Sequence, residues 1–166
     1  MGIVTRSLGL LLLAGALAAV TSCAESDGLS TIVGGLPAYG LITAEQAVRV
    51  LAALSEEPDF VLLDIRTPAE VAAGHLPGAT QLDFRSGTFA DDLATLDPNA
   101  TYLIYCRTAN RTGQAYRMMS DLGFDKVYDL DGGITRWSQL GYPTCVGEPG
   151  DEHVCSGEVP DLAALP

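Results

Sequence analysis

The amino-acid sequence predicts an α/β fold in which a parallel β-sheet carries helices on both faces. Two observations support this prediction. Short apolar runs of strand length alternate along the chain with segments of helical periodicity, which is typical of parallel sheets. Two of these runs, residues 60–64 and 101–105, are apolar almost throughout, as expected for strands that are covered on both faces.

The first half of the predicted fold begins with a helix. Thr43 and Gln46 form a capping-box pattern, and the apolar residues that follow them lie on one helical stripe. The next elements alternate in type. In order they are a strand at 60–64, a helix at 67–74 with Pro68 in its first turn, a short strand after the turn at Pro77 and Gly78, and a helix at 89–96 that Asp97 and Pro98 end.

The second half repeats the alternation. The strand at 101–105 is followed by a predicted helix at 108–122, with Gly123 where a C-terminal glycine belongs. A strand at 126–130 and a short helix at 134–141 complete the fold. Ligands of such sheets lie beyond the carboxyl ends of the strands, and Cys106 directly follows one of these ends.

The composition limits the functions that the chain can have. Its 166 residues suit one domain, and its net charge of −12 argues against binding to nucleic acid, which needs a basic surface. An apolar run at residues 8–20 follows Arg6 and is too short to span a bilayer. It predicts a signal peptide at residues 1–22.

The signal peptide ends in the residues VTSC, which resemble a bacterial lipobox. Lipidation would make Cys23 the mature N-terminus; the alternative is an ordinary signal peptide that is cleaved nearby. The glycine-rich residues up to 40 are interpreted as a flexible tether, residues 41–143 as the folded domain and residues 144–166 as a tail. We therefore expect an extracytoplasmic protein, held at a bacterial membrane only by its lipid anchor.

The four cysteines have different predicted fates. Cys145 and Cys155 lie in a tail with turn-forming residues, where a disulfide could close a short loop. The alternative is that one of them is a resolving thiol that reacts with Cys106. No spacing of cysteine or histidine supports a metal site, and none is expected. Cys106 is left unpaired, either as a small buried apolar residue or as a reactive thiol.

The segment TYLIYCRTANRT favours the reactive thiol. A strand that ends at Cys106 and a helix that soon follows force the chain between them through a tight loop, whose amides and helix N-terminus favour anions and a thiolate. Arg107 and Arg111 add positive charge to this loop. Thr108, Asn110 and Thr112 add hydrogen-bonding groups.

Several segments together resemble the rhodanese, or sulfurtransferase, family over residues 42–143. They are LLDIRTPAE, GHLPGA, YCRTANRT and LDGGITRWSQLGYP, in the order of the family. The family pattern often has a glycine where Ala109 stands, and an alanine with positive φ would be strained there. An aromatic residue is common in place of Val71. We interpret Asp64 and Arg66 as a structural ion pair beneath the loop.

The resemblance implies a rhodanese-like fold and a persulfide enzyme without a cofactor. Cys106 would take sulfur from a small or protein donor and pass it to an acceptor, with residues 107–112 (Arg107, Thr108, Ala109, Asn110, Arg111 and Thr112) around the sulfur. A monomer is expected. A module that binds a partner or carries sulfur without turnover is the alternative. Cysteine phosphatases have one more residue between the cysteine and the arginine of this loop. The shorter loop between Cys106 and Arg111 therefore favours sulfur transfer over phosphatase activity. His75 and Trp137 are interpreted as structural.

Overall fold

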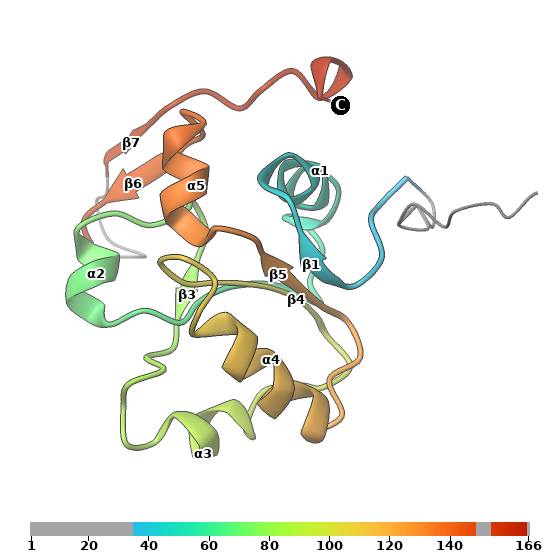
Figure 1. The fold of residues 1–166 in the computed structure, drawn as a ribbon, viewed down its shortest axis with the longest axis vertical. Helices are drawn as coiled ribbons and strands as arrows, with labels where there is room; N and C mark the ends of the chain where they lie inside the picture. The colour runs from blue at the N-terminus through green and yellow to red at the C-terminus, as the bar shows by residue number, and fades with distance from the viewer. Residues whose placement is uncertain (1–34, 149–153, 166) are drawn as a thin grey trace, which may run out of the picture.

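The computed structural model of the chain describes residues 35–148 and 154–165. Five parallel strands form one sheet in the order β1-β5-β4-β2-β3 (Figure 1). The strands are β1 (Gly40–Ile42), β2 (Phe60–Asp64), β3 (Thr80–Gln81), β4 (Thr101–Tyr105) and β5 (Val127–Leu130). The predicted α/β class is confirmed. The predicted signal peptide, Cys23 and most of the predicted tether lie outside the described residues.

Helices cover both faces of this sheet, as predicted. Helices α1 (Ala44–Leu54) and α5 (Gly133–Gln139) pack on one face, and α3 (Phe89–Leu93) and α4 (Thr112–Asp121) pack on the other (Figure 1). Successive residues of a strand point to opposite faces, so Leu103 joins the core under α1 and Ile104 joins the core under α4. This division explains why the central strands are almost continuously apolar.

Two of the helices begin at side-chain caps, and the sequence predicts the first of them. Thr43 and Gln46 form the capping box of α1. Thr67 and Glu70 form the same arrangement at α2 (Pro68–Ala72), which begins at Pro68. In each case a side-chain oxygen accepts a hydrogen bond from an otherwise unpaired amide of the first turn. Local sequence therefore determines where these helices start.

The predicted start of the helix after Cys106 is wrong. The helix was expected from Thr108, but α4 begins at Thr112. Ala109 has φ of +65°, which no right-handed helix can contain. Residues 107–111 therefore form a loop, and this loop brings the backbone round beneath the end of β4.

The first strand, β1, is missing from the sequence-based prediction. Its three residues lie at the expected boundary between tether and domain, and Leu41 is largely exposed. They pair in parallel with β5, with Leu41 beside Asp129. A strand this short at the sheet edge has too little apolar periodicity to be recognised from sequence.

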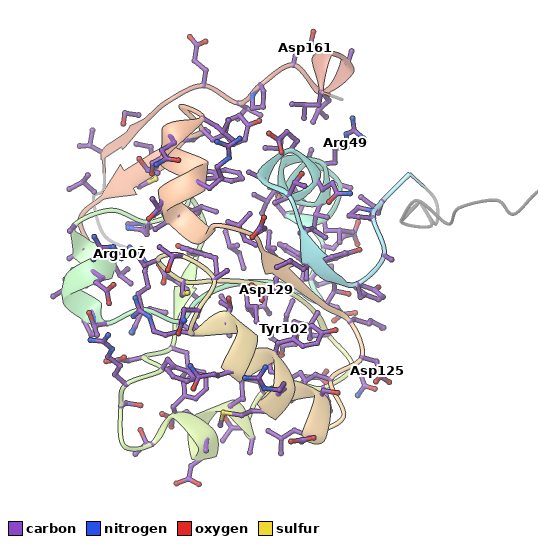
Figure 2. The ribbon with its side chains drawn as sticks, in the orientation of Figure 1. Arg49, Tyr102, Arg107, Asp125, Asp129 and Asp161 are labelled. Carbon is purple, nitrogen blue, oxygen red and sulfur yellow. A yellow bond between two sulfur atoms is a disulfide. The ribbon has the colours of Figure 1, made fainter. Side chains whose placement is uncertain are left out.

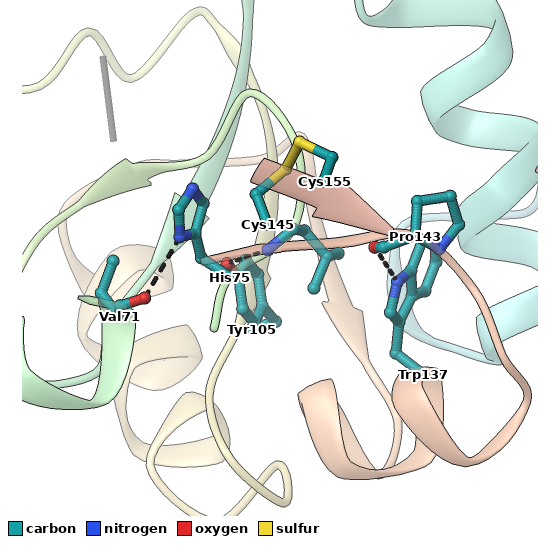
Figure 3. The surroundings of a disulfide bond; sticks show 8 residues. Val71, His75, Tyr105, Trp137, Pro143, Cys145 and Cys155 are labelled. Carbon is teal, nitrogen blue, oxygen red and sulfur yellow. Dashed lines mark hydrogen bonds between the residues drawn. A yellow bond between two sulfur atoms is a disulfide. The ribbon is translucent and has the colours of Figure 1, made fainter. Parts of the chain in front are cut away.

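The C-terminal residues form an ordered hairpin against the domain. Strands β6 (Thr144–Val146) and β7 (Val154–Ser156) pair antiparallel, and a Cys145–Cys155 disulfide joins them (Figure 3). The Cys145 N–H donates to the carbonyl of His75 at 2.8 Å, and the His75 N–H donates back at 2.9 Å. A short 3₁₀ helix, η1 (Leu162–Ala164), follows. These contacts attach the predicted tail to the rest of the fold.

The described residues contain no helix that is both long enough and apolar enough to span a membrane.

Candidate active site

Cys106 lies at the carboxyl end of β4, in the middle of the sheet. Its side chain is buried, at 1 % exposed, and it is the free cysteine of the described residues. The adjacent strand β2 ends in register with it, because Asp64 pairs with Tyr105. The loop that follows is more open than the thiol, since Arg107, Thr108 and Asn110 are exposed. The thiol therefore lies at the base of a loop whose rim faces solvent.

The loop at residues 106–111 keeps its amides available. Its carbonyl groups are held by α5, because Ile134 N–H donates to Cys106 O at 3.0 Å and Thr135 N–H donates to Arg107 O at 3.1 Å. Within the part of the chain that the structure describes, the N–H groups of residues 107–111 donate no hydrogen bond. Arg111 caps α4 without a side-chain hydrogen bond. The loop thus presents unpaired donors, as an anion-binding loop must.

Gly133 allows α5 to approach the loop this closely. A Cβ atom at this position would lie 2.3 Å from Cys106 O and 2.7 Å from the carbonyl carbon of Arg107. Its φ of +54° is also in the left-handed region that favours glycine. The second glycine of the Gly132-Gly133 pair is therefore required for the shape of the loop.

The two arginines of the loop have different environments. Arg111 donates to both carboxylate oxygens of Glu70, at 2.8 and 2.7 Å. This hydrogen bonding, opposed by partial burial and helped by Thr67, lowers the pKa of Glu70 to about 2. Arg107 forms no ion pair within the described ranges and is exposed. Arg111 therefore holds the loop to α2, and Arg107 remains available to an incoming anion.

Arg107, which is labelled in Figure 2, borders a hollow of about 370 Å³ beside the loop. Glu70 of α2, Thr135 and Ser138 of α5, and Thr144 and Val146 of β6 line other sides of it. The disulfide-linked hairpin thus supplies one wall of this hollow. We take the hollow as the approach to the Cys106 loop.

Thr112, the first residue of α4, lies close to the thiol. Its hydroxyl oxygen is 4.0 Å from Cys106 Sγ and donates to Ala109 O at 3.1 Å. Thr112 is fully buried. The sequence places Thr112 among the candidate site residues, and the structure brings its side chain beneath the loop.

The predicted ion pair between Asp64 and Arg66 is present. Arg66 also donates to Glu70 O at 3.1 Å and to Gly74 O at 2.6 Å, and its guanidinium lies over the Tyr105 ring at 5.6 Å from the centroid. Most donors of this guanidinium are engaged by groups of the protein itself. It supports α2 and the end of β2, in agreement with a structural role.

His75 and Trp137 make contacts that also agree with structural roles (Figure 3). Nδ1 of His75 is 3.1 Å from Val71 O, and its backbone bridges to β6. Trp137 is buried and donates from Nε1 to Pro143 O at 2.8 Å. Neither contact involves the Cys106 loop. The described residues also contain no cluster of three or more His, Cys, Asp or Glu side chains suited to a metal.

Asp129 is a charged residue near the site that the sequence analysis missed. It lies within β5, is 6 % exposed, and its Oδ1 atom has no hydrogen-bond partner among the described residues. Burial is the main cause that raises its pKa to about 6, with a smaller contribution from Asp131 and an opposing one from a Thr112 hydrogen bond. An aspartate inside the run KVYDL, a strand expected to be covered on both faces, was the available signal.

Comparison with known proteins gives consistent results. Residues 47–140, more than half of the chain, match the model of the rhodanese-like domain. A sulfurtransferase of Allochromatium vinosum is 35 % identical over 95 residues, which cover 57 % of this chain and 87 % of that protein. The thiosulfate sulfurtransferase GlpE of Pseudomonas entomophila is 38 % identical over 102 residues, covering 61 % and 86 %.

Solved structures show the same similarity. A rhodanese-related protein from Thermoplasma volcanium aligns with a TM-score of 0.55 at 25 % identity, covering 64 % of this chain and 97 % of that one. A rhodanese-like domain from Anabaena aligns with a TM-score of 0.54 at 27 % identity, covering 63 % and 76 %. The N-terminal residues and the C-terminal hairpin lie outside the range that matches the rhodanese-like domain.

Proposed function

The chain belongs to the family of rhodanese-like domains, and from this premise we propose that it is a sulfurtransferase that uses a persulfide on Cys106. It moves sulfane sulfur from a donor such as thiosulfate to a thiophilic acceptor. The observation that carries the proposal is a free thiol at the base of a loop with unpaired amides. The names of the relatives support the same class of reaction.

The proposed reaction has two displacement steps. The Cys106 thiolate attacks the outer sulfur of thiosulfate, the S–S bond of thiosulfate breaks, and sulfite leaves with the electron pair. The acceptor, for example cyanide or a thiolate, then attacks the terminal sulfur of the persulfide. The Cys106–sulfur bond breaks and the thiolate is formed again, so the cycle needs no outside oxidant or reductant.

The loop supplies the electrostatic part of this chemistry. The thiolate, the persulfide and the departing sulfite are all anionic, and the N–H groups of residues 107–111 have no other acceptor among the described residues. Donors that are already oriented stabilise such charge without reorganisation during the reaction. The N-terminus of α4 directly follows the loop, and the helix dipole adds a partial positive charge there.

The two arginines have separate proposed roles. Arg107 is exposed beside the hollow and attracts an anionic donor, whereas Arg111 is engaged by Glu70 and positions the loop. Replacing Arg107 with alanine should raise the KM for thiosulfate and leave kcat nearly unchanged, because it removes binding energy that ground state and transition state share. A fall in kcat at saturating thiosulfate would contradict this role.

We also propose that the protein acts outside the cytoplasm on a lipid anchor at Cys23. The Cys145–Cys155 disulfide supports an oxidising compartment. Cells that produce the full chain should incorporate labelled fatty acid into it, and Cys23→Ala should abolish the label. Labelling of that variant to the same extent would contradict the anchor.

The central experiment measures turnover of thiosulfate and cyanide to sulfite and thiocyanate. Wild-type protein should turn over, and Cys106→Ser should show none while it keeps the same circular dichroism spectrum. Turnover by Cys106→Ser would overturn the assignment of the nucleophile. A folded wild type without turnover, with any of several anionic donors, would instead favour a module that binds or carries sulfur.

A further inference from the structure

Asp129 lies on the neighbouring strand, on the same side of the sheet as Cys106. It pairs in register with Ile104 of β4, and Cys106 lies two residues further along that strand. Residues two apart in a strand point to the same face, which here is the face under α4. One strand spacing sideways and two residues along place the two Cα atoms roughly 8 Å apart.

The carboxyl group of Asp129 has few partners for a buried acid. Its Oδ1 atom has none in the described residues, and the Thr112 side chain is the neighbouring polar group that opposes the rise in its pKa. Burying an ionised carboxylate with so little compensation is unfavourable. The carboxyl is therefore poised between a protonated and an ionised form, in agreement with its pKa of about 6.

Thr112 connects this acid to the thiol. Its hydroxyl has a single proton and three candidate acceptors: Ala109 O at 3.1 Å, the Asp129 carboxyl, and Cys106 Sγ at 4.0 Å. The structure directs that proton to Ala109 O, and an ionised Asp129 competes with this carbonyl for it. A protonated Asp129 instead donates to the hydroxyl oxygen, which leaves the hydroxyl proton free to turn toward a thiolate at Cys106.

We propose that Asp129 is a positioning residue that controls, through the Thr112 hydroxyl and through its own charge, the pH at which Cys106 becomes nucleophilic. When Asp129 is ionised, its negative charge and its hold on the Thr112 proton both disfavour the thiolate. When it is protonated, both effects disappear.

The surroundings of Asp129 contain few other ionisable groups. Ile104 from β4 and Leu41 from β1 lie beside it in register, and neither can ionise. From α4, Tyr116 lies one turn after Thr112 and is half-buried. Asp131 is the acidic neighbour, and it is exposed at the end of the same strand. It provides the matched control for a charge effect.

The test follows the rate at which iodoacetamide alkylates Cys106 across a pH series, with the full chain and its disulfide intact. Peptide mass spectrometry of the Cys106 peptide separates this signal from other thiols. Asp129→Asn preserves the shape of the side chain and removes the charge. We expect it to move the midpoint of the alkylation profile down by about one pH unit, which is about tenfold in rate below the midpoint.

Two further variants separate the route through Thr112 from a general charge effect. Asp131→Asn removes the same charge from the exposed neighbour and should move the midpoint much less. In a Thr112→Val background, the effect of Asp129→Asn should shrink. An unchanged midpoint in a folded Asp129→Asn variant, or equal shifts for Asp129→Asn and Asp131→Asn, would overturn the proposal.

This inference rests on the proposed role of Cys106 as nucleophile, but its test does not use sulfur transfer. Alkylation reports the thiol alone. If the protein failed to turn over thiosulfate, the pH profile of alkylation would still decide whether Asp129 controls the thiol. Conversely, an active enzyme with an unchanged profile in Asp129→Asn would contradict only the role of Asp129.

Discussion

Two neighbouring strands in this molecule, β2 and β4, lead into helices. The polar groups that follow β2 have hydrogen-bond partners, whereas the backbone amides that follow β4 have none among the described residues. After β2, Arg66 binds Asp64, Glu70 O and Gly74 O, and the Thr67 capping box satisfies the first turn of α2. After β4, the amides of residues 107–111 donate to nothing in the described structure, and α4 begins without a side-chain cap. Both ends lie at the same edge of one sheet.

The difference shows that two segments at one edge of a sheet can have separate roles. One segment stabilises the structure, and the other keeps donors available for a ligand. The polar groups at the end of β2 are largely paired, and the Glu70–Arg111 ion pair links this end to the loop after β4. The open end after β4 is left with donors for a ligand. An unpaired, strained loop is stable only when its surroundings determine its shape. Each prediction below changes one side of this contrast.

The largest effect is expected from Gly133→Ala, which pushes α5 away from the open loop. The new Cβ would meet Cys106 O at 2.3 Å, so the loop must move. A displacement of about 1 Å in a catalytic group can cost about 100-fold in rate, and we expect a loss of that order in kcat/KM. Gly113→Ala in α4 is the control, because a Cβ there meets nothing within 4 Å. Equal activity of both variants would show that α5 does not shape the loop.

Asp129→Asn tests whether the protein loses stability in keeping an acid beneath the open loop. The folded-state pKa is raised from 3.8 to about 6, so the folded protein holds this proton more tightly than the unfolded chain. Stability is therefore lost as the pH rises from about 3.8 through about 6. Above pH 6 the variant should be more stable than wild type by about 2–3 kcal/mol, and below pH 4 the two should be alike.

The check on this prediction is urea unfolding at a series of pH values. Asp131→Asn, at an exposed position, should follow the wild type within about 0.5 kcal/mol. A difference between wild type and Asp129→Asn that stays constant with pH would contradict the raised pKa.

Glu70→Gln breaks the link between the two strand ends. The pKa of Glu70 is lowered to about 2, so the stability it contributes is present above the unfolded pKa of 4.5 and is lost as the pH falls toward 2. Allowing for its partial exposure, we expect a loss of about 2 kcal/mol at pH 7. The loss should narrow between pH 4.5 and pH 2, while Glu57→Gln, an exposed control, should have no such effect. A pH-independent loss would rule out the ion pair as its cause.

The smallest effect is expected from Ala109→Gly, which relieves strain in the open loop. Ala109 has φ of +65°, a conformation that glycine adopts without a Cβ penalty. The free energy of unfolding should rise by about 1 kcal/mol. Ala73→Gly, where φ is −73°, should not stabilise. Thermal denaturation of both variants decides the matter, and equal effects would mean that the loop conformation is unstrained.

The sequence predicts most of the fold because its signals are local. The capping boxes of α1 and α2, the apolar strands and the position of Cys106 after β4 all depend on neighbouring residues. The resemblance to rhodaneses also identified Ala109 as the position where strain was expected, and its φ of +65° agrees.

The unpredicted features depend on contacts between distant segments. The Glu70–Arg111 pair joins residues 41 positions apart, and it separates the roles of two arginines that look alike in the sequence. The start of α4 was placed too early because residues 108–111 have no strong helix breaker, and only the closed loop shows the left-handed residue. The position of Asp129 on the same face of the sheet as Cys106 depends on the register of two parallel strands, which no local pattern encodes.

The most direct test of the central claim is to weigh the protein after exposure to thiosulfate without reductant. A persulfide on Cys106 should add one sulfur atom, about 32 Da, to the peptide that contains Cys106, and this mass should be lost when cyanide is added. Cys145 and Cys155 should remain linked throughout. Sulfur on any other residue, or no gain in a protein that nevertheless turns over thiosulfate, would contradict a persulfide on Cys106.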